Sequence, residues 1–183
     1  MSSPYKIPIL DLRAQYSGIC AEVRVAIDEV LESQQFILGP TVSLFEEQMI
    51  QYLGCAHAVG VASGSDALLL ALMALEIGPG DGVIVTPFTF FSSVSSITRL
   101  GATALFVDID AADYLLSEQA VDKFLSERAR RQNGRTIDHL TGLHIKALLL
   151  VHLFGQCCAM AEFLRVAQKF SLHIVEDVAQ ACG

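Results

Sequence analysis

Short apolar segments that alternate with helical patterns constrain the fold more than any other feature of this sequence. Beyond residue 56, each apolar run is separated from the next by a helical pattern or a loop. The runs occupy residues 57–62, 83–86, 103–107, 146–151 and 172–176. Alternation of strands and helices is typical of a parallel sheet with crossover helices. The sequence therefore predicts an α/β fold, with a mainly parallel sheet flanked by helices on both faces.

An arm and a first amphipathic helix are predicted at the start of the chain. Residues 7–16 contain the turn-forming residues Pro8 and Asp11, and we predict that they are extended. Over residues 19–31 the apolar side chains recur at the spacing of one helix face, with charged side chains between them. This pattern predicts a helix with one apolar face.

A second helix is predicted after a Gly-Pro turn, and it completes the N-terminal region. Thr41 is its predicted N-cap, the apolar positions run from residue 44 to 53, and Gly54 is predicted to end it. The period of the apolar residues then changes from helical to strand-like. We therefore divide the chain into residues 1–56, an arm with two helices, and residues 57–183, an α/β domain.

Residues 126–144 interrupt the alternation of strands and helices. They contain a cluster of arginines around Asn133-Gly134, and Asn-Gly is a strong signal for a hairpin turn. We predict that this segment is a solvated β-hairpin or loop inserted into the domain. The alternative is that its arginines bind a phosphate or a partner.

The composition argues against several classes of protein. A net charge of −8 disfavours general binding to nucleic acid or to an anionic membrane. The five cysteines show neither metal-ligand nor disulfide spacing, which is typical of reduced thiols in a cytosolic protein. The first residues lack the apolar core of a signal peptide, and the longest apolar run, residues 67–75, is too short to span a bilayer. We expect a cytoplasmic protein without a metal site.

Candidate binding residues gather where the predicted strands end, because ligands of open α/β sheets bind at the carboxyl ends of strands. The run Ser63-Gly64-Ser65-Asp66 lies between a predicted strand and the helix predicted at 67–75. Free N–H groups at the start of a helix favour a phosphate group. This turn is therefore a candidate phosphate site, and the alternative is that Ser65 is an ordinary N-cap.

Aromatic and imidazole side chains follow two further strands. Phe88, Phe90 and Phe91 come after the strand at 83–86, where an aromatic face can support a planar ring. We expect Phe88 and Phe91 themselves to pack in the core. His152 follows the strand at 146–151, and we predict a hydrogen-bonded structural histidine.

The stretch that begins at His173 carries the strongest polar signal. An apolar strand runs into Glu176-Asp177, and Gln180 follows one helical turn later. Asp177 is either a ligand-binding carboxylate in the crevice or the N-cap of a following helix. A phosphate cradle, an aromatic face, a carboxylate and an amide together match pyridoxal 5'-phosphate, whose ring nitrogen is kept protonated by a paired aspartate.

Short motifs of one family run nearly end to end along the chain. They are Leu10-Asp11-Leu12, Gln15-Tyr16, Phe36-Ile37-Leu38-Gly39-Pro40, Ser63-Gly64-Ser65-Asp66-Ala67-Leu68, Gly78-Pro79-Gly80-Asp81, Phe88-Thr89-Phe90, Gly101-Ala102, Phe106-Val107-Asp108, Val151-His152-Leu153-Phe154-Gly155-Gln156, Glu176-Asp177 and Ala179-Gln180. In this order they resemble the N-terminal half of the DegT-type nucleotide-sugar aminotransferases. These are fold type I pyridoxal-phosphate enzymes, so the resemblance implies the large domain of that fold, here incomplete.

The resemblance implies how the chain would hold the cofactor. The backbone around Gly64, Ser65 and Asp66 would bind the phosphate group. Phe90, where the family has an aromatic residue, would stack on the pyridine ring.

The resemblance also implies which residues would contact the polar atoms of the cofactor ring and which would line the substrate side of the pocket. Asp177 would pair with the ring nitrogen, and Gln180 would hydrogen-bond the ring hydroxyl. Gln34 and Phe36 would line the nucleotide-sugar side of the pocket.

The family's chemistry requires one residue that these 183 residues do not provide. Its members use glutamate as the usual amino donor and transfer the amino group to a nucleotide-linked keto sugar, in polysaccharide or antibiotic sugar biosynthesis, and they work as homodimers. The lysine that holds the cofactor as a Schiff base is expected beyond Gly183, so no catalytic residue is assigned within the chain. We expect a fragment that is inactive alone.

Two alternatives remain open from the sequence. The first is a non-catalytic truncated chain, or one partner subunit of a split enzyme. The second is a pyridoxal-phosphate-dependent sugar dehydratase. Among aminotransferases, the Asp-Leu opening and the loop before Pro40 resemble members that act at the third sugar carbon more than the fourth.

Overall fold

The computed structural model describes residues 10–182. The chain forms two compact units, one that extends to Gly60 and one that starts at Val61. In the described residues, no helix combines the length and the apolar character that crossing a membrane requires.

The first unit contains helix α1 (Leu12–Ser33). The carboxylate of Asp11 accepts hydrogen bonds from the N–H groups of Arg13 (3.1 Å) and Ala14 (3.0 Å), so it caps the helix. The predicted extended arm is therefore wrong from Leu12 onward. Residues 7–9 of that arm, which include Pro8, lie outside the described residues.

Helix α2 (Pro40–Leu53) starts earlier than predicted. Its N-cap is Gly39 and not Thr41. Proline has no N–H to leave unpaired, and its fixed φ suits the first helical turn, so Pro40 begins the helix. Gly54 ends the helix, as predicted, with a φ of +65°.

Residues 57–62 do not form the predicted strand. A strand needs a neighbouring strand to pair its backbone N–H and C=O groups, and none of the described strands pairs with this segment. The N–H of Gly60 instead donates to the carboxylate of Glu46 in α2 (2.7 Å), and the side chain of Val59 is 79% exposed. The prediction of a strand at 57–62 is therefore wrong.

The second unit is built on a six-stranded sheet. Its strands are β1 (Asp81–Val85), β2 (Thr103–Phe106), β3 (Ala129–Gln132), β4 (Arg135–Asp138), β5 (His144–Val151) and β6 (His173–Asp177). Strands β2, β1, β5 and β6 are parallel to one another, with β1 along one edge of β5 and β6 along the other. The predicted mainly parallel sheet is confirmed, and the carboxyl ends of its parallel strands meet at one edge.

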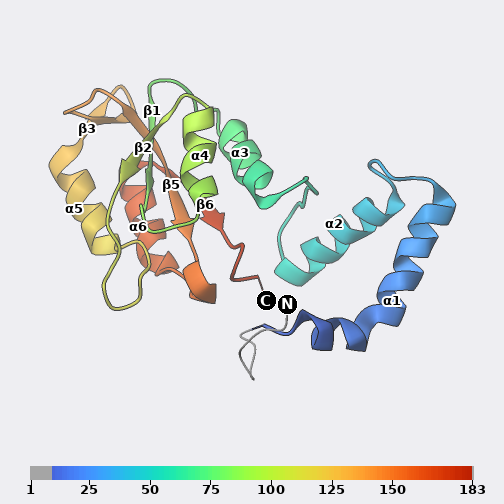
Figure 1. Cartoon of the computed structure of the whole chain (residues 1–183). Helices are drawn as coiled ribbons and strands as arrows, with labels where there is room; N and C mark the ends of the chain where they lie inside the picture. The colour runs from blue at the N-terminus through green and yellow to red at the C-terminus, as the bar shows by residue number, and fades with distance from the viewer. Residues whose placement is uncertain (1–9, 183) are drawn as a thin grey trace. The chain divides into compact units, whose positions relative to one another are not determined.

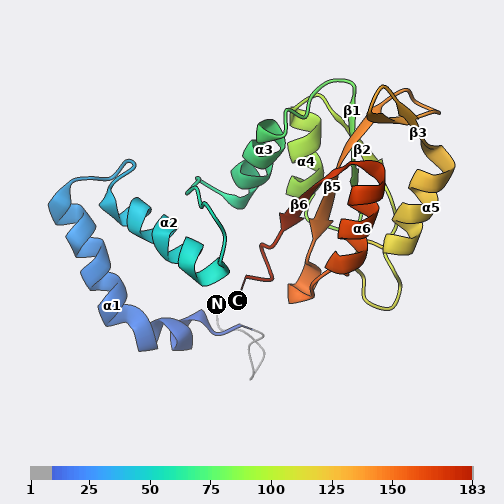
Figure 2. The same ribbon diagram turned by 180° about the vertical axis from the view of Figure 1, so that it is seen from behind.

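Helices cover both faces of this sheet, as predicted (Figures 1 and 2). They are α3 (Gly64–Ala74), α4 (Phe91–Arg99), α5 (Glu118–Arg128) and α6 (Met160–Phe170). Leu149 of β5 packs with side chains of α3 and α4, whereas Leu148 and Leu150 pack with α5 and α6. Alternate residues of a strand point to opposite faces, so a strand that is buried on both faces reads as a continuous apolar run.

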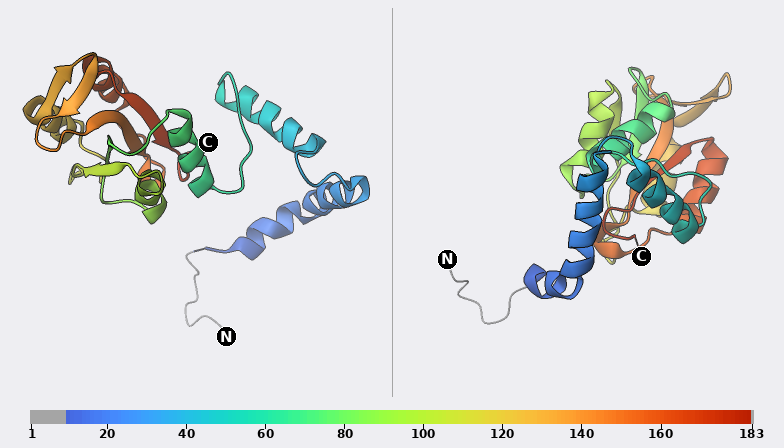
Figure 3. Two further views of the ribbon diagram at one scale, coloured as in Figure 1. Left: turned by 90° about the horizontal axis from the view of Figure 1, so that it is seen from above. Right: turned by 90° about the vertical axis from the view of Figure 1, so that its right-hand side faces the viewer.

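The segment predicted as a hairpin excursion is a hairpin, formed by the antiparallel strands β3 and β4 (Figure 3). Asn133 (φ 49°) and Gly134 (φ 79°) both adopt the left-handed conformation that a two-residue hairpin turn requires. Strand β4 also pairs with the first residue of β5, His144, so the hairpin extends the sheet.

An ion pair between the buried Asp138 and the partly exposed Arg128 anchors this hairpin to α5. Asp138 has no exposed surface, and its carboxylate accepts hydrogen bonds from Arg128, Thr141 and the N–H of Leu140. Burial alone would raise the pKa of the Asp138 carboxyl, but these hydrogen bonds and the guanidinium charge hold that pKa below its usual value.

Removal of the Asp138 carboxylate is expected to destabilise the second unit. Asp138→Ala leaves the Arg128 guanidinium without its partner, and we expect a loss of about 3–5 kcal/mol in the free energy of unfolding. The matched control is Asp122→Ala, which breaks the exposed Asp122–Lys169 ion pair between α5 and α6 and should cost less than about 1 kcal/mol. Urea unfolding of the two variants measures the difference, and equal losses would contradict the anchoring role.

The contribution of Asp138 should also depend on pH. Its folded-state pKa lies below its unfolded-state pKa, so the carboxylate stabilises the fold fully above the unfolded value and loses that effect as pH falls through the folded value. The stability gap between the wild type and Asp138→Asn should therefore be constant near neutral pH and shrink below about pH 4. Urea unfolding across this range tests the sign, and a gap that widens in acid would contradict it.

Candidate functional site

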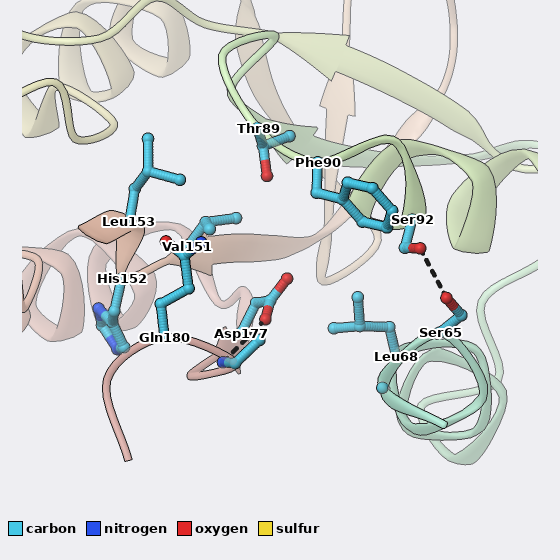
Figure 4. A pocket seen from close by; sticks show the side chains of 12 residues that line it. Ser65, Leu68, Thr89, Phe90, Ser92, Val151, His152, Leu153, Asp177 and Gln180 are labelled. Atoms are coloured by element: carbon cyan, nitrogen blue, oxygen red, sulfur yellow. Dashed lines mark hydrogen bonds between the residues drawn. The ribbon is translucent and has the colours of Figure 1, made fainter. Parts of the chain in front are cut away.

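A cavity of about 430 Å³ lies at the carboxyl ends of β5 and β6 and at the start of α3 and α4 (Figure 4). Five of the residues predicted to bind the cofactor contribute to its wall. The full lining is Gly64, Ser65, Leu68, Thr89, Phe90, Ser92, Val151, His152, Leu153, Asp177, Ala179 and Gln180. Segments that are far apart in the sequence thus meet where the parallel strands end, which is where ligands of such sheets bind.

The start of α3 presents free backbone donors to the cavity. The helix is capped by Ser63, whose hydroxyl accepts the N–H of Asp66 (3.1 Å), so Ser65 is not the N-cap. Gly64 and Ser65 occupy the first turn, where N–H groups have no acceptor within the helix. Their positions in the cavity wall suit an anionic group.

Asp66 is not brought into the cavity wall. Its N–H is taken by Ser63, and its carboxylate accepts the Ser63 hydroxyl (3.0 Å). The Ser65 hydroxyl instead meets the Ser92 hydroxyl at the start of α4 (2.6 Å), so the two helix starts are joined beside the cavity (Figure 4).

Phe90 precedes α4 and places an aromatic ring in the cavity wall. It is 75% exposed, so its ring is free to contact a ligand. The prediction that Phe88 and Phe91 pack in the core is wrong, because they are 44% and 75% exposed. The buried face of α4 is formed by Ser93, Ser96 and Ile97 instead.

Asp177 is the last residue of β6, and its carboxylate is held at both oxygens. Oδ1 accepts the N–H of Ala179 (3.2 Å), and Oδ2 accepts the hydroxyl of Ser93 (3.2 Å). The described residues after Asp177 form a turn, and the contact with the N–H of Ala179 is of the kind that an N-cap aspartate also makes, so both predicted roles of Asp177 remain predictions. Each oxygen keeps a lone pair for a further donor.

Gln180 is oriented by a tight turn after β5. The 3-10 helix η1 (Leu153–Gly155) places Phe154 in the left-handed conformation (φ 58°), and the Phe154 N–H donates to Oε1 of Gln180 (2.7 Å). One lone pair of the amide carbonyl oxygen is therefore taken by a backbone donor. The amide NH₂ of Gln180 remains as a donor at the cavity.

His152 has partners at both ring nitrogens, in agreement with a structural role. It is buried, and its Nδ1 accepts the N–H of Cys158 (3.0 Å). The proton must then lie on Nε2, which donates to the carboxylate of Glu176 (3.0 Å). This contact links the ends of β5 and β6 at the cavity.

The Cys158 thiol and the described lysines do not line the cavity. Burial raises the pKa of the Cys158 thiol to about 11, so the thiol is neutral at physiological pH. The described lysines Lys123, Lys146 and Lys169 are absent from the cavity wall. In residues 10–182 no cluster of three or more His, Cys, Asp or Glu side chains is arranged to hold a metal ion.

Gln34 and Phe36 lie in the first unit. Gln34 ends α1 and donates from its Nε2 to the carbonyl of Leu31 (2.5 Å). Phe36 is 55% exposed beside an open apolar groove of α1. Their assignment to the nucleotide-sugar side of a pocket remains a prediction.

Sequence reasoning missed the hydroxyl groups that support the cavity. Thr89 and Ser92 line it, and Ser93 lies behind Asp177 with no exposed surface. The available signal was the set of four serines at 92, 93, 95 and 96, which is unusual for the buried face of a helix.

Comparison with known proteins identifies relatives of the chain. Residues 19–183 match the DegT/DnrJ/EryC1/StrS aminotransferase family. A UDP-N-acetyl-3-dehydro-alpha-D-glucosamine 3-aminotransferase of Acidithiobacillus ferrooxidans is 38% identical over 100% of this chain and 45% of its own length. A dTDP-3-amino-3,4,6-trideoxy-alpha-D-glucose transaminase of Streptomyces venezuelae is 40% identical over 97% of this chain and 43% of its own length.

Solved structures give the same result. A DegT DnrJ EryC1 StrS aminotransferase from Brucella abortus superposes with a TM-score of 0.87 at 32% identity, over 96% of this chain and 44% of that one. DesV of S. venezuelae, solved in complex with a ketimine intermediate, superposes with a TM-score of 0.84 at 39% identity, over 97% and 43%. The chain spans less than half the length of the relatives it matches. The fold is that of the fold type I enzymes, and the chain belongs to the DegT/DnrJ/EryC1/StrS aminotransferase family.

Proposed function

We propose that this chain forms the cofactor-binding part of a pyridoxal-phosphate-dependent aminotransferase that acts on a nucleotide-linked keto sugar, with glutamate as the amino donor. The observation that carries the proposal is the cavity that joins the start of α3, Phe90, Asp177 and Gln180. Relatives over the whole chain are named as transaminases of nucleotide sugars, which supports the same reaction.

The donors and acceptors of the cavity fit pyridoxal 5'-phosphate. The N–H groups of Gly64 and Ser65 suit its phosphate dianion, and the exposed ring of Phe90 suits the face of its pyridine ring. Asp177 has free lone pairs for a protonated ring nitrogen, and the Gln180 NH₂ is a donor for the ring oxygen. No group in this set is left without a matching partner on the cofactor.

In this proposal the residues bind and orient the cofactor, which supplies an electron sink when it is bound. The Asp177 carboxylate would keep the proton on the ring nitrogen, because its negative charge favours the positive ring. The Phe90 ring would fix the ring plane, and Leu68 and Val151 would exclude water from the cavity. The helix start at Gly64 would fix the position of the phosphate.

The proposed substrate is a nucleotide-linked keto sugar, and the proposed site of amino transfer is the third sugar carbon. The two relatives described above are both named for amino transfer at the third sugar carbon, which favours that position over the fourth. The same names favour transamination over the dehydratase alternative. The lysine that the reaction requires would come from outside the described residues, because the described lysines lie outside the cavity wall.

A homodimer is proposed as the working form. No residue of α1 or α2 is buried, and apolar side chains such as Ile27 and Phe45 are more than half exposed. Exposed apolar surface of this kind is typical of an interaction site.

The five free thiols support the proposed cytoplasmic location.

The proposed function can be tested with the amine form of the cofactor, because this form binds without a Schiff base to a lysine. Pyridoxamine 5'-phosphate should bind the chain, and Asp177→Asn should raise its Kd by about tenfold or more, because a hydrogen bond to a charged group is lost. The matched control is Asp108→Asn, which changes another carboxylate that follows a strand of the sheet but does not line the cavity. Isothermal titration calorimetry measures both, and the proposal fails if the wild type does not bind or if the two variants lose affinity equally.

The oligomeric state tests the role of α1. Ile27 lies on the apolar stripe with Val23 and Val30, whereas Val25 lies among acidic residues of the same helix. We expect a dimer in sedimentation velocity, dissociated by Ile27→Lys but not by Val25→Lys. A monomeric wild type, or equal effects of the two substitutions, would count against the proposed dimer.

A further inference from the structure

We propose that Ser93 is a positioning residue that orients the Asp177 carboxylate toward the ring nitrogen of the cofactor. This inference rests on the proposed function and assigns a role to a residue outside the cavity wall. Ser93 does not line the cavity, so it would act only through Asp177.

The contact between these two residues is buried and specific. Ser93 lies in the first turn of α4 with no exposed surface, and its hydroxyl is 3.2 Å from Oδ2 of Asp177. The two residues are 84 positions apart in the chain, so the contact is made only when α4 packs on the sheet. The start of a helix also favours a nearby negative charge.

The direction of the hydrogen bonds follows from the chemistry of the groups. A carboxylate can only accept, so the single hydroxyl proton of Ser93 must point to Asp177. The hydroxyl of Thr89 lies 3.0 Å from the Ser93 hydroxyl, and it must then be the donor in that contact. The chain of donation therefore runs from Thr89 at the cavity through Ser93 to Asp177.

This arrangement fixes the plane of the carboxylate. The N–H of Ala179 holds Oδ1 from the turn after β6, and Ser93 holds Oδ2 from α4. Two donors on different oxygens prevent rotation of the carboxylate about its own axis. Without Ser93, only the contact with the adjacent turn remains, and the carboxylate is free to turn away from a ring in the cavity.

Ser96 provides a comparison on the same helix. It is also a buried serine, but its hydroxyl donates to the backbone carbonyl of Ser93 within α4 (3.1 Å). A serine that needs only to satisfy its own hydroxyl can do so in this way. The Ser93 hydroxyl instead donates its hydrogen bond to the Asp177 carboxylate, which belongs to another element, β6.

The test compares two ligands and two matched variants of the full chain. The ligands are pyridoxamine 5'-phosphate and its 1-deaza analogue, in which carbon replaces the ring nitrogen. The variants are Ser93→Ala and, as a control, Ser96→Ala. Ser93→Cys keeps the side-chain volume but donates more weakly, so it serves as a second variant if the alanine variant does not fold. Calorimetry gives each Kd.

We expect Ser93→Ala to raise the Kd of pyridoxamine 5'-phosphate by about tenfold, because a hydrogen bond to a charged group is removed. The Kd of the deaza analogue should stay the same, because that ligand has no ring nitrogen for Asp177 to meet. Ser96→Ala should leave both values unchanged, and Ser93→Cys should follow Ser93→Ala.

Failure of the inference and failure of the proposed function give different results. If the wild type binds pyridoxamine 5'-phosphate but Ser93→Ala changes neither Kd, or raises both equally, Ser93 is not a positioning residue and the proposed function stands. If the wild type binds neither ligand, the proposed function is wrong and this inference falls with it.

Discussion

The position of every group in the cavity depends on the backbone pairing of β5. This strand pairs with β1 along one edge, and with β4 and β6 along the other. Its register with β6 sets Val151 opposite Asp177, so the carboxylate and the turn that holds Gln180 are neighbours. The register with β1 brings the loop that carries Phe90 to the same edge. Strands buried on both faces tolerate little slippage, since a shift of one residue exchanges their two faces.

The cavity therefore consists of side chains held from behind by the core. Asp177, Gln180 and His152 each have at least one partner outside the space that a ligand would fill. In the part of the chain that the structure describes, no buried side-chain nitrogen or oxygen lacks a hydrogen-bond partner. Groups that are oriented before a ligand arrives lose little conformational entropy when it binds. This preorganisation is the physical basis for assigning a binding role to a cavity of ordinary size.

Much of this arrangement could be predicted from local patterns. Apolar runs of strand length predicted β1, β2, β5 and β6, and Asn133-Gly134 predicted the β3–β4 hairpin, because these signals act over a few residues. The strand at 57–62 failed since pairing depends on a neighbour that the local pattern does not reveal. The contact of Ser93 with Asp177 was missed for a related reason. A hydrogen bond between residues 84 positions apart leaves no periodic trace in one sequence.

The central claim is that the cavity holds a pyridoxal-type cofactor with its ring nitrogen on Asp177. A crystal structure of the chain grown with pyridoxamine 5'-phosphate tests it most directly. We expect the ring nitrogen at about 3 Å from a carboxylate oxygen of Asp177. We also expect the phosphate at the N–H groups of Gly64 and Ser65, and the ring against Phe90. A ligand that binds elsewhere on the chain, or in this cavity with its phosphate at Asp177, would contradict the claim.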